Sequence, residues 1–147
     1  MSKNSSKVIN LGCRLNFFES EVIKNILAEN NIDQKIVINT CAVTNQAVRK
    51  SINEVKKASK NFPAHKILVT GCASQIEKKK FSKLANVSRI IDNDKKTEFG
   101  SYTGATSQTK KVFKFPHLGN FISSRSRATL QIQQGCDHRC TFCIIPF

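Results

Sequence analysis

Apolar residues recur along the chain in a repeated order: a short run, then a cysteine, then a stripe with helical spacing. The first run, residues 8–11, leads to Cys13, and the stripe that follows consists of Phe18, Val22, Ile26 and Leu27. The second run, residues 36–38, leads to Cys41, and its stripe consists of Val48, Ile52 and Val55. The pattern predicts a strand, a cysteine loop and a helix, twice in succession.

A third unit repeats this order with fewer apolar positions. Its run, residues 67–69, leads to Cys72, a polar stretch of helical character follows over residues 74–84, and residues 87–91 indicate a fourth strand. Runs that are apolar at every position are typical of parallel strands buried on both faces. The alternation predicts an α/β fold, an open, mostly parallel sheet with flanking helices and right-handed crossovers.

The predicted sheet should bring three distant cysteines together. Cys13, Cys41 and Cys72 each follow a strand, and the carboxyl ends of parallel strands share the edge where ligands bind. The alternative is that each is a small residue tolerated at a tight turn. That alternative accounts more easily for one such cysteine than for three.

Beyond the third unit the pattern changes. Residues 97–127 are rich in Gly, Ser, Thr and Lys, and alternation over residues 129–133 predicts one further strand that leads into Cys136. We therefore expect a domain over residues 4–100, a linker over 101–127, and the start of a second unit over 128–147.

The net positive charge of the chain indicates which kind of partner it binds. The chain has 24 basic and 10 acidic residues and a formal charge of +14, which favours a polyanion such as nucleic acid. Residues 78–80, three consecutive lysines, are equally compatible with a solvated helix face. No apolar run approaches the roughly 18 residues of a membrane helix, and no signal-peptide core follows Met1. We expect a soluble, cytoplasmic protein without a membrane partner.

In a reducing compartment, the six cysteines are better explained as metal ligands or catalytic thiols than as disulfides. Cys136, Cys140 and Cys143 lie in one short loop, as in a segment that wraps a metal centre. Thiolates favour zinc, copper(I) and iron–sulfur clusters, but structural zinc normally has four ligands, often in close pairs. A cubane cluster held by three cysteines leaves one iron open for chemistry. Two triplets predict two such clusters, with zinc or inert thiols as alternatives.

The closing triplet, with Phe142 directly before Cys143, resembles the signature loop of radical S-adenosylmethionine enzymes. The segments 11–16, 39–44 and 69–73 look like the three cysteine motifs of the methylthiotransferase N-terminal domain, so the resemblance covers essentially the whole chain. It implies two 4Fe-4S clusters. The auxiliary cluster falls on Cys13, Cys41 and Cys72, and the radical cluster, with S-adenosylmethionine near Phe142, falls on Cys136, Cys140 and Cys143.

The residues beside these cysteines, 14–16, 42–44 and 135–146, look most like the MtaB type of the family. That resemblance implies transfer of a methylthio group to C2 of N6-threonylcarbamoyladenosine, 3′-adjacent to the anticodon of tRNA. Its partners are tRNA and an electron donor such as flavodoxin or ferredoxin. Arg14 and Arg139 are expected to contact substrate or offset cluster charge, unless they are only local ion-pair partners.

The chain departs from the family pattern in two respects. Gln134 stands where relatives often have Asp, outside the ligand set. The family continues into a radical S-adenosylmethionine barrel and an RNA-binding TRAM domain, of which only the first barrel strand and its loop are expected here. We therefore predict that this chain alone is inactive. The alternative functions are a zinc-dependent nucleic-acid-binding module and a methylthiotransferase of another type.

Overall fold

A parallel sheet forms the centre of the computed structural model, which describes residues 5–103, 132–133 and 135–146. Its strands are β1 (Lys7–Asn10), β2 (Lys35–Thr40), β3 (Lys66–Gly71) and β4 (Val87–Ile90). All neighbouring pairs are parallel, and the order across the sheet is β1-β2-β3-β4. The first four predicted strands are therefore confirmed, together with the open parallel arrangement.

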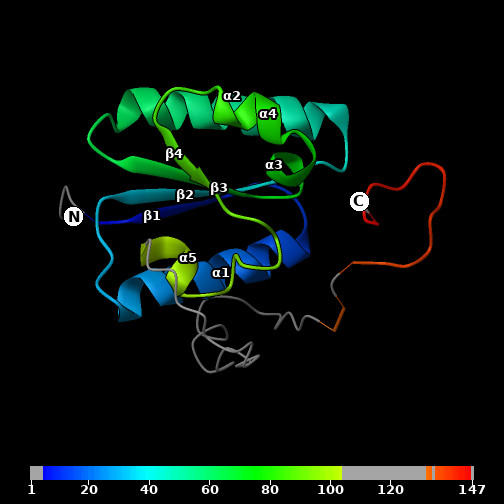
Figure 1. Ribbon diagram of the computed structural model, residues 1–147, viewed down its shortest axis with the longest axis horizontal. Helices are drawn as coiled ribbons and strands as arrows, with labels where there is room; N and C mark the ends of the chain where they lie inside the picture. Colours follow the sequence, from blue (N-terminus) through cyan, green and yellow to red (C-terminus); the bar gives the residue numbers. More distant parts are fainter. Residues whose placement is uncertain (1–4, 104–131, 134, 147) are drawn as a thin grey trace.

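Helices cover both faces of the sheet (Figure 1). On one face lie α2 (Asn45–Asn61), α3 (Cys72–Ile76) and α4 (Lys78–Ser82), and on the other lie α1 (Arg14–Glu29) and α5 (Gly100–Thr103). The predicted α/β fold with flanking helices is confirmed.

Alternate residues of the central strands supply the two halves of the core, because side chains alternate between the faces of a strand. One cluster, on the α2 side, contains Ile36, Ile38, Val55, Ile67, Val69 and Phe81. The other, on the α1 side, contains Ile23, Leu27, Val37, Leu68, Ile91 and Tyr102. This burial on both faces explains why the strands are apolar at every position.

The first crossover differs in hand from the two that follow. The strands cross the sheet in chain order, yet α1 lies on one face, and α2, α3 and α4 lie on the other. Crossovers that advance in the same direction over opposite faces have opposite hands, so they cannot all be right-handed. The prediction of right-handed crossovers throughout is wrong. As a consequence, the loop after β1 turns toward one face and the loop after β2 toward the other.

Two further differences concern the ends of elements. The predicted helical stretch 74–84 is broken at Glu77, whose N–H donates to Ala73 O at 2.9 Å while its own carbonyl accepts from Lys80 N at 2.8 Å. The linker predicted to begin at residue 101 starts inside α5. Tyr102 of that helix is 1% exposed, because it completes the core on the α1 side.

Ile132 and Gln133 are not in a strand. The rest of the strand predicted over 129–133, and residues 104–127 of the predicted linker, lie outside the described residues, as does Gln134.

Candidate metal centre at the carboxyl edge

Polar side chains join the carboxyl ends of neighbouring strands. Asn16 Nδ2 donates to Leu11 O at 2.7 Å and to Thr40 O at 2.9 Å, which ties the loop after β1 to the end of β2. Thr40 Oγ1 donates to Thr70 O at 2.7 Å, and Thr70 Oγ1 donates to Ile91 O at 2.9 Å. These bonds hold four strand ends in fixed relative positions, although sequence reasoning assigned none of these side chains a role.

Cys13, Cys41 and Cys72 lie at this edge. Cys13 is the N-cap residue of α1, Cys41 follows the last residue of β2, and Cys72 begins α3. Their side chains differ in exposure: Cys13 is exposed, Cys72 half-buried and Cys41 buried. The three cysteine motifs therefore lie at one edge of the sheet, but their thiols differ in exposure to solvent.

The loop after β1 packs directly onto Cys41. Gly12 has φ +113°, and a Cβ there would lie 2.5 Å from Cys41 Cβ and 2.7 Å from Cys41 Sγ. Only glycine fits this position, because both the backbone conformation and the space exclude a side chain. This close approach brings the loop that carries Cys13 against the second cysteine.

The thiols also act on one another electrostatically. Burial raises the pKa of the Cys72 thiol; Lys96 opposes this rise, while Cys41, Cys13 and Glu19 add to it. Cys13 and Cys41 are therefore among the groups whose charge would act on the Cys72 thiol.

A pocket opens where the loops diverge to opposite faces of the sheet. It has a volume of about 430 Å³, and its lining residues are Asn10, Leu11, Gly12, Cys41, Ala47 and Lys50. Open α/β sheets bind ligands in crevices of this kind, outside the carboxyl ends of strands whose loops part. The reversed first crossover thus creates a ligand-sized space beside Cys41.

The donors at this edge are three thiols, the ligand type of iron–sulfur clusters. In the described part of the chain, no three His, Cys, Asp or Glu side chains form a group that could hold one metal ion. A cubane takes one thiolate at each of several irons, so its ligand sulfurs stand further apart than those around one ion. Three soft thiols on three loops, beside a pocket and a glycine that allows close approach, fit such a centre.

The closing loop carries the second triplet. Cys136 and Cys143 are half-buried, Cys140 is exposed, and Cys143 N donates to Cys140 O at 3.1 Å in a turn. Phe142 is 92% exposed, so its ring is available for contact. Nothing in the described segment brings these thiols into a coordinating group.

Contact with the core places the closing loop near the carboxyl edge. Ile144 packs against the core cluster on the α2 side, and Figure 1 shows the segment beyond the carboxyl ends of the strands. The two cysteine triplets therefore lie on the same side of the molecule. Arg14, the first residue of α1, and Arg139 are both exposed there.

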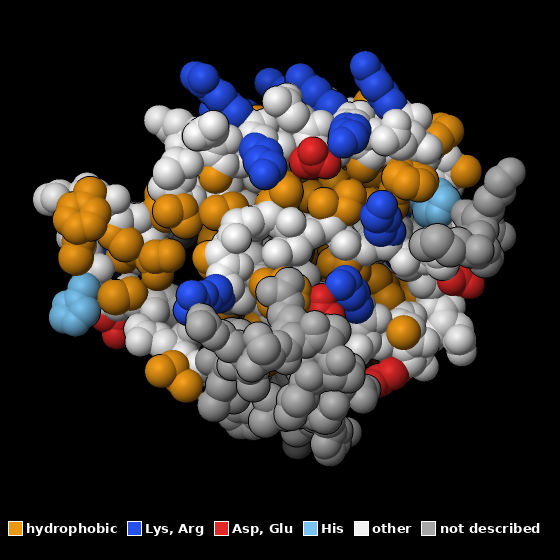
Figure 2. Space-filling view, turned by 180° about the vertical axis from the view of Figure 1, so that it is seen from behind, with side chains coloured by type: hydrophobic (Ala, Val, Ile, Leu, Met, Phe, Trp, Pro, Cys, Tyr) orange, Lys and Arg blue, Asp and Glu red, His pale blue; other side chains and the backbone are white. Residues whose placement is uncertain are grey.

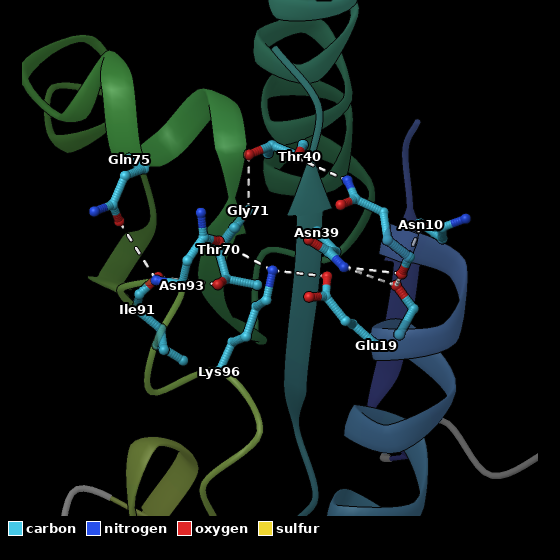
Figure 3. Close-up of polar contacts among 12 residues, drawn as sticks. Asn10, Glu19, Asn39, Thr40, Thr70, Gly71, Gln75, Ile91, Asn93 and Lys96 are labelled. Atoms are coloured by element: carbon cyan, nitrogen blue, oxygen red, sulfur yellow. Dashed lines mark hydrogen bonds and ion pairs between the residues drawn. The ribbon is translucent and has the colours of Figure 1, made fainter. Parts of the chain in front are cut away.

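A buried ion pair beneath the edge was not predicted. Glu19 Oε2 on α1 lies 2.7 Å from Lys96 Nζ, and the two side chains are 1% and 3% exposed (Figure 3). Glu19 follows the first cysteine motif closely, but Lys96 is one of 24 basic residues, and no pattern distinguishes it.

The chain is thus an α/β domain with cysteines after three neighbouring strands, at the carboxyl edge of its parallel sheet. The profile of the Uncharacterized protein family UPF0004 matches residues 6–92, which include all three strand-end cysteines. The chain belongs to this family. No solved structure matches it significantly.

Curated relatives are methylthiotransferases. Threonylcarbamoyladenosine tRNA methylthiotransferase MtaB of Rickettsia prowazekii (strain Madrid E) is 38% identical over 148 residues, which cover 96% of this chain and 35% of that protein. MtaB of Bacillus subtilis (strain 168) is 30% identical, with 93% of this chain and 35% of that protein covered. Ribosomal protein uS12 methylthiotransferase RimO of Christiangramia forsetii is also 30% identical, with 99% and 34% covered.

These matches confirm the predicted resemblance to methylthiotransferases and favour the MtaB type over the RimO type. The chain spans about a third of the length of the relatives it matches. Within the described residues, no helix is both long and apolar enough to span a membrane.

Proposed function

We propose that this chain forms the cluster-carrying N-terminal domain of a methylthiotransferase that modifies tRNA. The observation that carries the proposal is the meeting of Cys13, Cys41 and Cys72 at one sheet edge, beside a pocket of about 430 Å³. These thiols would hold an auxiliary 4Fe-4S cluster, and the pocket would leave room for a small ligand next to it.

The closing loop would supply the second centre. Cys136, Cys140 and Cys143 would hold a 4Fe-4S cluster to which S-adenosylmethionine binds, with the exposed ring of Phe142 beside it. With S-adenosylmethionine and an electron donor such as flavodoxin or ferredoxin, the clusters would supply radical chemistry that exchanges a C–H bond for a methylthio group. The similarity to MtaB favours C2 of N6-threonylcarbamoyladenosine in tRNA as the acceptor.

Surface charge supports tRNA as partner. The helix α2 carries five basic residues and one acidic residue, whereas α1 carries two basic and three acidic residues. Figure 2 shows Lys and Arg side chains gathered along the upper part of the molecule, the layer of α2 and α4. A basic layer on one side fits the phosphate backbone of an RNA.

The test is metal content after anaerobic reconstitution with iron and sulfide. The unaltered chain should take up about eight irons, and the triple variant Cys13→Ser/Cys41→Ser/Cys72→Ser should keep about four, because only one triplet remains. The matched control, Cys136→Ser/Cys140→Ser/Cys143→Ser, should keep a similar number at the other site.

Full iron content in the first triple variant would show that the strand-end cysteines hold no cluster. A colourless chain that retains zinc after anaerobic purification would favour a zinc-dependent nucleic-acid-binding module instead.

A further inference from the structure

One ion pair is buried among the four in the described residues. The pairs Lys24–Glu21, Lys78–Asp92 and Lys80–Glu77 are at least partly exposed, whereas Glu19 and Lys96 are 1% and 3% exposed. Each buried ion costs several kcal/mol of lost hydration, and such a pair is often no more stabilising than apolar residues. Stability of the fold alone therefore gives a weak reason for charges at this place.

Several contacts fix the Lys96 ammonium. Besides Glu19, it donates a hydrogen bond to Asn93 Oδ1 at 3.1 Å. Figure 3 shows the Lys96 ammonium joined to Glu19 on α1 and to Asn93 in the segment after β4. Glu19 lies between two residues of α1, Asn16 and Ser20, whose oxygens accept hydrogen bonds from Asn39 Nδ2 at 3.0 and 3.2 Å. The ion pair therefore lies at the carboxyl end of β2, the strand that Cys41 follows.

The two charges of the pair act on Cys72 in opposite directions, and Lys96 affects it more strongly than Glu19 does. A buried charge is also screened far less than the exposed lysines of this basic chain.

We propose that Lys96 is a positioning residue whose buried ammonium offsets the negative charge of a thiolate-bound iron–sulfur centre at Cys13, Cys41 and Cys72. This inference rests on the proposed function. A centre held by thiolates gains one negative charge when it accepts one electron from a low-potential donor, and net charge helps to set its reduction potential. The nearby ammonium therefore favours the reduced form, while Glu19 orients that ammonium and moderates its effect.

The experiment measures reduction potentials in the background Cys136→Ala/Cys140→Ala/Cys143→Ala, so that only the strand-end centre is loaded. Each variant is reconstituted with iron and sulfide and titrated with dithionite under spectroscopic observation. At a fixed solution potential, Lys96→Met should lower the ratio of reduced to oxidised cluster about tenfold. For a one-electron couple, this equals a decrease of ~59 mV in the reduction potential. Glu19→Gln should shift the potential in the opposite direction, because it leaves the ammonium without its counter-ion.

The double variant Glu19→Gln/Lys96→Met removes both charges and should lie between the two single variants. Lys96→Met leaves a buried carboxylate without a partner, which is strongly destabilising. If that variant does not fold, the comparison of the double variant with Glu19→Gln still measures the effect of the Lys96 charge. The matched control is Lys35→Met, which removes a lysine at the opposite, amino end of the sheet that donates to Tyr102 O. It should leave the potential unchanged.

Equal potentials in all folded variants, with normal iron and sulfide content, would overturn the inference and leave the proposed function intact. A background protein that takes up no iron and sulfide would overturn both. Shifts of opposite sign for Lys96→Met and Glu19→Gln would support it, because loss of packing alone has no reason to follow the sign of the charge removed.

Discussion

At the scale of single residues, Tyr102 connects the helix α5 to Lys96 of the buried ion pair. Its ring is 1% exposed in the core on the α1 side, and its hydroxyl donates to the carbonyl of Lys96. Burial, and to a smaller degree the nearby Glu19, raises the pKa of Tyr102 far above its ordinary value. The folded chain therefore holds this phenol neutral well into the alkaline range.

This difference predicts a loss of stability at high pH. Below about pH 10 the phenol is neutral in both the folded and the unfolded chain, and its contribution is complete. As pH rises further, only the unfolded chain ionises, so the free energy of unfolding should fall by up to about 1.4 kcal/mol per pH unit. Alkaline titration followed by phenolate absorption and circular dichroism checks this, because Tyr102 is the one tyrosine and the chain has no tryptophan.

The phenolate band should appear together with unfolding, and Tyr102→Phe should lose this part of the pH dependence. Phenolate that forms near the ordinary pKa, in a chain whose circular dichroism is unchanged, would contradict the prediction.

Residue patterns predicted the positions of the three strand-end cysteines but not what lies beneath them. Cys13, Cys41 and Cys72 could be placed because each follows an apolar run, and parallel strands share one carboxyl edge. Lys96 comes from an irregular segment after β4, where neither periodicity nor spacing distinguishes one lysine from the others. Its role depends on burial against Glu19, which is a property of the folded chain alone.

At the scale of elements, the hand of the first crossover determines where the pocket lies. If α1 lay on the same face as α2, the loops after β1 and β2 would turn the same way, and no crevice would open between them. The sequence shows that α1 has an apolar stripe but not which face of the sheet receives it. The general preference for right-handed crossovers therefore gave the wrong answer at the site itself.

The turn between β3 and α3 is the tightest point of this edge. Gly71 has φ +97°, and a Cβ there would lie 2.3 Å from Thr40 O and 2.6 Å from Asn39 Oδ1. Gly71→Ala should therefore lower the free energy of unfolding by about 3 kcal/mol or more, through backbone strain together with displacement of the β2 end. Denaturant unfolding of the metal-free chain measures this.

Gly135→Ala is a matched control, because Gly135 also has a positive φ, +77°, but a Cβ there would have no atom within 4 Å. Its effect should stay near about 1 kcal/mol or below. Equal losses in the two variants would show that backbone conformation alone, and not the contact with β2, makes Gly71 necessary.

At the scale of the whole molecule, the helices on the two faces of the sheet differ in charge within the described residues. On the α2 and α4 layer, exposed basic residues include Arg49, Lys50, Lys56, Lys57, Lys60, Lys78, Lys79 and Lys80. In the opposite layer, the long helix α1 has more acidic than basic residues. Because Lys50 both belongs to the basic layer and lines the pocket beside Cys41, an RNA bound along this layer would lie next to the cysteine edge.

This arrangement predicts a one-sided RNA-binding surface. Lys56→Gln/Lys57→Gln removes two exposed charges from α2 and should weaken tRNA binding by about tenfold at moderate salt. The slope of log affinity against log salt should fall by about 1.5, since each lost phosphate contact removes ~0.7–0.9 from it. Filter binding or fluorescence anisotropy over a series of salt concentrations measures both quantities.

The matched control is Lys24→Gln/Lys95→Gln, which removes two exposed lysines from α1 and from the segment after β4. Both double variants carry the same net charge, so a uniform field around the chain would weaken binding equally in the two. A docking surface on α2 would leave the control close to the unaltered chain. Equal losses would therefore show that overall charge, rather than the α2 and α4 layer, governs the encounter with RNA.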